Sequence, residues 1–281
     1  MEPRAVRIGL RAASTFVMLF LYLPLLVIVL QAFSASKIPG WPIGNLTTHW
    51  FRLAWNDQFA RTAFENSVTV GLRAAAVALV LGSCIAFALS RFKFFGQNTV
   101  SLLFVLPIAL PGIVTGLALL STIDYLGITP SLWTVVAGHA TFCIVVVFNN
   151  VVARLRRSST SLEEASMDLG ADGWQTFRHV TLPSIATALV AGGLLAFALS
   201  FDEVVVTTFT AGAQTTLPIF ILNNLRQGQQ LPIVNVVALA VILLTAIPVV
   251  LAQRLTTDTG VLRRSGGEVI DAVESAQPTT V

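Results

Sequence analysis

Six long runs of apolar residues, separated by shorter polar segments, dominate the pattern of this sequence. The runs cover residues 15–33, 74–90, 100–122, 131–153, 182–201 and 232–251. A helix needs about 20 apolar residues to cross a hydrocarbon core about 30 Å thick, and each run is close to that length. The pattern therefore predicts an all-α integral membrane protein with six transmembrane helices.

Two of the segments between these runs are expected on the outer face of the membrane. Three indole side chains lie in residues 34–65: Trp41, Trp50 and Trp55. Indole rings favour the headgroup layer, so part of this segment is predicted to lie along the membrane surface. The segment 202–231 is rich in Thr, Gly and Gln and is interrupted by Pro218. We expect an outer loop there, with one short re-entrant or interfacial helix.

The basic residues indicate the orientation. Most of the 17 Lys and Arg residues lie in segments that alternating crossings place on the same side as the N-terminus: Arg4, Arg7, Arg11, Arg91, Lys93, Arg154, Arg156, Arg157, Arg178, Arg254, Arg263 and Arg264. Few lie in the opposite segments: Lys37, Arg52, Arg61 and Arg226. Because cytoplasmic segments of membrane proteins carry the excess of Lys and Arg, both termini are predicted to be cytoplasmic.

These crossings predict three parts of the chain. Residues 1–14 form a cytoplasmic tail, residues 15–256 a transmembrane domain, and residues 257–281 a polar cytoplasmic tail that we expect to be disordered. The basic start before an apolar run is also typical of a secretory signal peptide. The run exceeds the usual apolar region of about 7–15 residues and contains Pro24, which favours an uncleaved first helix.

Composition supports a membrane protein. Of the 281 residues, 55% are hydrophobic and 11% are charged, whereas a soluble domain carries about a quarter charged residues. The net charge is only +3 and the basic residues are scattered, which argues against nucleic acid as a partner. Cys84 and Cys143 lie inside apolar runs without metal-ligand spacing. We therefore expect no metal and no cofactor.

The region 158–183 is a polar island between the fourth and fifth runs, and its pattern predicts a first helix followed by a turn. Two capping boxes are possible at the helix start: Thr160 with Glu163, and Ser161 with Glu164. Gly170 is a natural C-terminal stop.

A second helix is predicted after this turn. Asp172 with Gln175 offers its N-terminal cap. Leu182 and Pro183 are expected to end it, because proline has no N–H with which to continue a helix. The island is therefore expected to be a cytoplasmic helix–turn–helix.

The surface of this island favours a protein partner. Apolar side chains occur on both predicted helices: Leu162, Ala165, Met167, Leu169, Trp174 and Phe177. A helix lying on the inner leaflet would carry a polar face rich in Lys and Arg. Here the first helix is acidic, at Glu163, Glu164 and Asp168, and anionic lipid repels such a face.

The island resembles the EAA loop in the inner-membrane permease subunits of ATP-binding-cassette (ABC) importers. Five residues stand at positions of that motif: Glu164, Ala165, Gly170, Leu182 and Pro183. Ser166 replaces the second alanine and Val180 the usual isoleucine. Asn66-Ser67, residues 106–112 and residues 200–203 look like the spermidine/putrescine branch of these permeases.

This resemblance implies a fold, a function and a set of partners. The fold is that of a type I ABC importer permease in a bacterial inner membrane. A dimer of ATP-binding subunits docks on the island, a second homologous permease subunit completes the pathway, and an external substrate-binding protein delivers polyamines. The chain has no GxxxxGK[ST] phosphate loop, so we expect no catalytic residue and no ATP hydrolysis by this subunit alone.

Asp202 and Glu203 are the candidate residues of the substrate pathway. They directly follow the fifth run, and Asp202 lies about 27 Å along the helix from Ser184, which places these acids near the outer interface. A carboxylate there would stabilise an ammonium-bearing substrate. Alternatively, these acids end the helix, or pair with Arg73 or Arg226.

Several polar or helix-disturbing residues within the runs have structural interpretations. Pro107 and Pro111 predict a static kink in the third helix, with a hinge as the alternative. Asn149 and Asn150 are expected to hydrogen-bond between helices, with lining of the pathway exit as the alternative. His139 is expected to be a packing histidine with satisfied hydrogen bonds rather than a proton relay.

Other functions fit less well. The same permease role could serve phosphate, sulfate, iron or an amino-acid derivative. An ion-driven secondary transporter would usually show internal repeats and ionisable groups near the midplane, where only His139 stands. A polytopic membrane enzyme would need a cluster of catalytic residues, and the sequence shows none.

Overall fold

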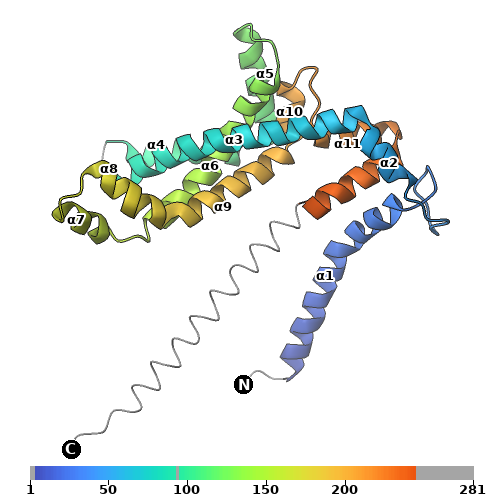
Figure 1. The fold of residues 1–281 in the computed structure, drawn as a ribbon, viewed down its shortest axis with the longest axis horizontal. Helices are drawn as coiled ribbons and strands as arrows, with labels where there is room; N and C mark the ends of the chain where they lie inside the picture. The colour runs from blue at the N-terminus through green and yellow to red at the C-terminus, as the bar shows by residue number, and fades with distance from the viewer. Residues whose placement is uncertain (1–3, 93–94, 245–281) are drawn as a thin grey trace, which may run out of the picture. The chain divides into compact units, whose positions relative to one another are not determined.

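The computed structural model describes residues 4–92 and 95–244, and in that part of the chain every regular element is a helix (Figure 1). The chain divides into two compact units. One comprises Met1–Trp55 with Gly228–Val281, and the other comprises Asn56–Gln227. The second unit contains every candidate site residue, so its architecture decides how the site is built.

Three long helices form the core of the second unit: α3 (Gln58–Arg91), α6 (Leu132–Leu155) and α9 (Leu182–Phe201) (Figure 1). Val70 packs near Val135 and Gly82 near Val147, so α3 and α6 run parallel. Gly71 contacts Phe197 and Leu79 contacts Gly193, and α9 therefore runs antiparallel to both. This is the direction that alternating membrane crossings require of the second, fourth and fifth spans.

Small side chains allow these helices to approach closely. A Cβ atom at Gly82 would lie 2.8 Å from the carbonyl oxygen of Ile144, so only glycine fits there. The buried core continues on both sides of this contact with Ala75, Ala78, Ala86, Cys143, Val147, Val151, Ile185 and Ala196. Such small-residue interfaces are typical of membrane helices, whose association depends on close packing.

Four of the predicted spans are confirmed by helices that are long and apolar enough to cross a membrane. They are Val6–Ala32, Gln58–Arg91, Leu132–Leu155 and Gly173–Phe201. At about 1.5 Å per residue, the 34 residues of α3 extend about 51 Å, well beyond the apolar run on which its prediction rested. The sixth predicted span is helical over Leu231–Leu244, and its remaining residues, 245–251, lie outside the described residues.

The third predicted span is not one helix, which corrects the prediction of a kink. The chain forms α4 (Gln97–Ala109) and α5 (Gly112–Tyr125), each too short to cross the membrane alone. Leu110 and Pro111 between them are extended, with ψ of 141° and 132°. Pro111 has no N–H and excludes its predecessor from the helical region, so the helix stops instead of bending.

The two halves pack mainly on different elements, although Leu119 of α5 also approaches Gly138 of α6. In α4, the ring of Phe104 contacts that of Phe148 on α6. In α5, Gly112 approaches Val205 at the start of α10 (Val205–Thr210). The break at Pro111 therefore lets one apolar run cover two separate surfaces.

The segment after α9 contains two short helices, α10 and α11 (Leu217–Gln227), rather than the single one predicted. Pro218 lies at the start of α11, where a missing N–H costs nothing. α3 holds the connection between these helices. The Asn66 side chain donates to the carbonyl oxygen of Thr215 at 2.9 Å, and the Ser67 hydroxyl accepts from the Leu217 N–H at 2.8 Å.

The first unit contains α1 (Arg4–Ala32), α2 (His49–Asn56, whose last residue belongs to the second unit) and the helix Leu231–Leu244. α1 begins at Arg4, so helix covers most of the segment predicted as a tail, and Pro24 lies inside it. Ala32 packs with Val236 and Leu239. The predicted C-terminal tail, 257–281, lies outside the described residues.

Candidate functional site

The candidate site is a hairpin of short helices between α6 and α9. It consists of α7 (Ser161–Asp168), α8 (Gly173–Thr176) and the π-helical turn η1 (Phe177–Thr181). Figure 1 shows it at the end of the second unit where α3 and α6 terminate. The predicted helix–turn–helix therefore exists.

Gly170 makes the turn between the two helices. Its φ of +91° is left-handed, which glycine adopts without strain. The Gly170 N–H donates to Met167 at 2.9 Å and the Ala171 N–H donates to Ser166 at 3.1 Å. These two bonds form a Schellman motif, which satisfies carbonyl groups at the end of α7. The predicted glycine stop is confirmed.

The capping boxes predicted for the two helices are present at the start of α8 and absent at the start of α7. At α8 the predicted capping box is present: the Asp172 carboxylate accepts from the Gln175 N–H at 2.8 Å, and the Gln175 amide oxygen accepts from the Asp172 N–H at 3.0 Å. At α7 both predicted boxes are wrong, because the N-cap residue Thr160 makes no side-chain cap and Ser161 is already the first residue of the helix, with its hydroxyl bonded to that of Ser159. The carboxylate of Glu163 has other partners.

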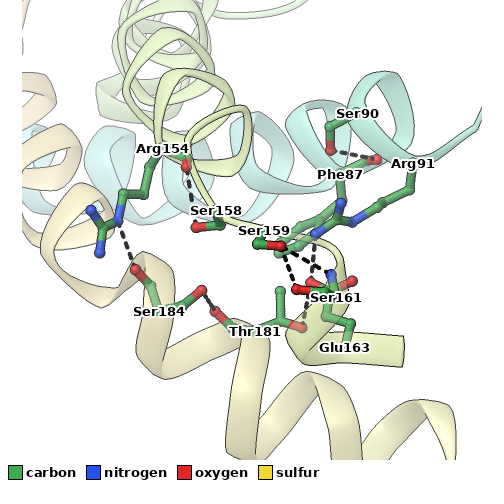
Figure 2. Close-up of polar contacts among 10 residues, drawn as sticks. All are labelled: Phe87, Ser90, Arg91, Arg154, Ser158, Ser159, Ser161, Glu163, Thr181 and Ser184. Carbon is green, nitrogen blue, oxygen red and sulfur yellow. Dashed lines mark hydrogen bonds and ion pairs between the residues drawn. The ribbon is translucent and has the colours of Figure 1, made fainter. Parts of the chain in front are cut away.

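Glu163 points from α7 toward the bundle, as Figure 2 shows. It forms an ion pair with Arg91, the last residue of α3, and accepts a hydrogen bond from the Thr181 hydroxyl at 2.9 Å. Thr181 is buried at the junction of η1 with α9. One carboxylate thus joins three elements that are far apart in the sequence.

The expectation that Leu182 and Pro183 end the second helix is wrong. α8, η1 and α9 follow without interruption as one helical segment, Gly173–Phe201. The Leu182 N–H bonds to the carbonyl oxygen of Phe177, five residues back, so the chain is widened by a π-turn where Pro183 enters. Such a turn tolerates the missing N–H of proline near a helix start.

The outer face of the hairpin is apolar and acidic. Leu169 is 90% exposed and Trp174 67% exposed, and Leu162 and Met167 are exposed beside them. Glu164 and Ala165 are also exposed, whereas Glu163 is only partly exposed. The structure therefore brings Glu164, Ala165 and Gly170 into one hairpin and places Leu182 and Pro183 at the start of α9.

Asp202 and Glu203 lie at the opposite end of α9 and have different environments. Asp202 directly follows the last residue of α9 and is exposed. The Glu203 carboxylate accepts from the Val206 N–H at 3.0 Å and so caps α10. Within the described residues neither acid forms an ion pair with Arg73 or Arg226. Arg73 instead stacks over the ring of Trp133, at 4.6 Å from its centre.

His139 is a satisfied packing residue, as predicted. Its ring nitrogens lie 2.7 Å from the Ser200 hydroxyl and 2.9 Å from the Thr207 hydroxyl. The prediction for the asparagines is wrong, because Asn150 bonds to Val146 within its own helix and Asn149 is exposed. No group of three metal-ligating side chains occurs among residues 4–92 and 95–244.

Comparisons with known proteins give this geometry a context. Residues 78–259 match a family model described as the binding-protein-dependent transport system inner membrane component. The chain is 35% identical to the putrescine transport system permease protein PotI of Escherichia coli K12, over 82% of this chain and 84% of that protein. It is 33% identical to the spermidine/putrescine transport system permease protein PotC of Shigella flexneri, over 91% and 96%.

A solved structure shares the fold. It belongs to a bacterial ABC transporter involved in the import of the acidic polysaccharide alginate. The TM-score is 0.69 at 17% sequence identity, and the match covers 90% of this chain and 98% of that one. At this identity the similarity concerns the fold alone.

Proposed function

We propose, from the premise that this chain belongs to the family of binding-protein-dependent transport system inner membrane components, that it forms half of the translocation pathway of a polyamine importer. The chain is an ABC importer permease subunit. Beyond this, we propose its cargo and the roles of its residues.

The proposed mechanism rests on the exposed face of the α7–α8 hairpin. Leu169 and Trp174 present exposed apolar area on the hairpin, and Glu164 of the same hairpin is exposed as well. Exposed apolar patches mark interaction sites. We assign this face to the ATP-binding subunit, whose ATP-driven closure moves the hairpin. Gly170 supports the face because its turn sets the angle between α7 and α8.

The proposed assembly contains a dimer of ATP-binding subunits, a second homologous permease subunit and an external substrate-binding protein. The hairpin and both termini lie on the cytoplasmic side. The gathering of Arg91, Arg154, Arg156 and Arg157 at the hairpin end of the bundle supports this orientation, because cytoplasmic segments are rich in basic residues.

The proposed cargo is a polyamine such as putrescine or spermidine. The relatives named for these solutes cover most of the chain. Asp202 supplies an exposed carboxylate at the end of α9 away from the hairpin, where an ammonium group entering from outside would meet it. Glu203 is assigned a structural role in this proposal, since it caps α10.

Reconstitution tests this function. The chain, copurified in mild detergent with its partner subunits and placed in proteoliposomes, should take up labelled putrescine or spermidine only with ATP and the binding protein. Uptake driven by an ion gradient without ATP would contradict the importer role. Absence of polyamine binding by the partner binding protein would contradict the cargo and leave the permease role intact.

A different cargo is the second candidate. The alginate importer shows that this fold also serves an acidic polysaccharide, so the fold does not decide the solute. Competition by unlabelled phosphate, sulfate, iron or amino-acid derivatives, in the same uptake assay, separates this candidate from the first.

A further inference from the structure

We infer that Glu163, through Arg91 and Thr181, is the positioning residue that transmits displacement of the hairpin to α3 and α9. This inference rests on the proposed docking of an ATP-binding subunit on the hairpin. The two adjacent acids of α7 then have different roles. Glu164 is exposed and available to the docked subunit, whereas Glu163 binds Arg91 and Thr181 and so connects the hairpin to α3 and α9.

The three partners occupy positions from which a movement would spread. Arg91 is the last residue of α3, Thr181 is the last residue before α9, and Glu163 stands in the first turn of α7 (Figure 2). The side chains of Arg91 and Glu163 are 22% and 19% exposed, so water reaches them only partly. A displacement of α7 therefore acts through these bonds on the ends of α3 and α9.

The other contacts of α7 connect it less directly to α3 and α9. It follows α6 through a turn at residues 156–160, and it contacts α8 through the Ser166 and Thr176 hydroxyls at 3.2 Å. Among the described residues, Arg91–Glu163 is the ion pair that joins α7 to α3. The ring of Phe177 packs on Phe87, which fastens η1, rather than α7, to the same end of α3.

A purely stabilising role explains the cluster less well. A partly exposed ion pair contributes little to folding stability because water screens it and its side chains lose freedom. Without Arg91, the Glu163 side chain would be available to cap α7, as its position in the sequence predicts. One oxygen of Glu163, Oε1, instead accepts from both Arg91 on α3 and Thr181 before α9, so a displacement of this carboxylate acts on both elements at once.

The test uses the whole importer in proteoliposomes and measures ATP hydrolysis and uptake separately. In Glu163→Gln and in Arg91→Gln, the ATP-binding subunit should still copurify and hydrolyse ATP, whereas uptake per ATP should fall by about fivefold or more. The exchanged pair, Arg91→Glu with Glu163→Arg, should recover most of the loss. Thr181→Val should give a smaller loss, because it removes only the hydroxyl bond.

A matched control removes the same charge at the same end of the bundle. Arg157→Gln loses a guanidinium whose Nε donates to Ala153, four residues back in the chain, so uptake per ATP should stay at the wild-type value. Normal coupling in Glu163→Gln would overturn the inference while leaving the docking role intact.

Two further outcomes are decisive. Loss of the ATP-binding subunit from the Glu163→Gln complex would overturn the inference, because it would make Glu163 part of the docking face. Failure of the wild-type chain to copurify with any ATP-binding subunit would overturn the proposed function and this inference together.

Discussion

A ring nitrogen of His139 lies 2.7 Å from the hydroxyl oxygen of Ser200, and this bond ties α6 to α9 inside the bundle. The other ring nitrogen lies 2.9 Å from the hydroxyl of Thr207 on α10. Ser200 and Thr207 stand on either side of Asp202 and Glu203. One buried imidazole therefore holds both sides of the bend that presents the Asp202 carboxylate.

Replacing His139 should loosen this bend. His139→Ala removes two buried hydrogen bonds and leaves the Ser200 hydroxyl unpaired, whereas Thr207 keeps its bond to the carbonyl oxygen of Glu203, so the free energy of unfolding should fall by about 1–3 kcal/mol. Thermal unfolding of the purified subunit in detergent measures this change. His49→Ala, the same substitution at an exposed position, should leave the midpoint unchanged. Equal midpoints for the two variants would contradict the role given to His139.

The two acids at the bend should differ in their effect on transport. Asp202→Asn should raise the KM for a polyamine by about tenfold, because a charge-assisted contact with an ammonium group is lost. Glu203→Gln should change KM little, since the amide oxygen can still accept the Val206 N–H. Uptake at a series of polyamine concentrations measures both. Similar KM values for wild type and Asp202→Asn would remove Asp202 from the pathway.

The turn at Gly170 should be sensitive to backbone strain rather than to crowding. A Cβ atom there would meet nothing within 4 Å, but the φ of +91° disfavours a branched side chain by about 1–3 kcal/mol. Gly170→Val should therefore reduce recovery of the ATP-binding subunit on copurification, while membrane insertion stays normal. Gly173→Ala, at an open site with ordinary φ, is the control. Full recovery with Gly170→Val would show that the turn does not shape the docking face.

Gly82 should be sensitive to crowding instead. Gly82→Ala forces a methyl group against the carbonyl oxygen of Ile144 and should destabilise the α3–α6 contact by about 1–3 kcal/mol. Gly9→Ala, where a Cβ atom meets nothing within 4 Å, should be neutral or slightly stabilising. Unfolding midpoints of the two variants in detergent give the comparison, and an unchanged midpoint for Gly82→Ala would contradict the close packing.

Local chemistry explains which elements could be predicted from the sequence. The Schellman turn at Gly170 and the capping box of Asp172 with Gln175 involve residues within a few positions of each other, so sequence spacing contains the information. The four confirmed spans follow equally from the length of their apolar runs, because a bilayer imposes that length on any helix that crosses it.

Residues whose partners are distant in the chain were predicted poorly. Glu163 has the spacing of a capping residue, but Arg91, 72 positions away, competes for its carboxylate with a full positive charge. Pro111 was expected to bend a helix, yet the chain breaks there because α4 and α5 find separate surfaces on α6 and α10.

The sequence by itself determined that this is a helical membrane protein with a polar hairpin after its fourth apolar run, because hydropathy and capping act over short distances. Only the tertiary structure decided which acid of the hairpin faces outward and which is tied to α3, and that Glu203 caps a helix while Asp202 stays exposed. The physical reason is that a carboxylate bonds to the strongest donor near it, and the tertiary structure determines which donors are near.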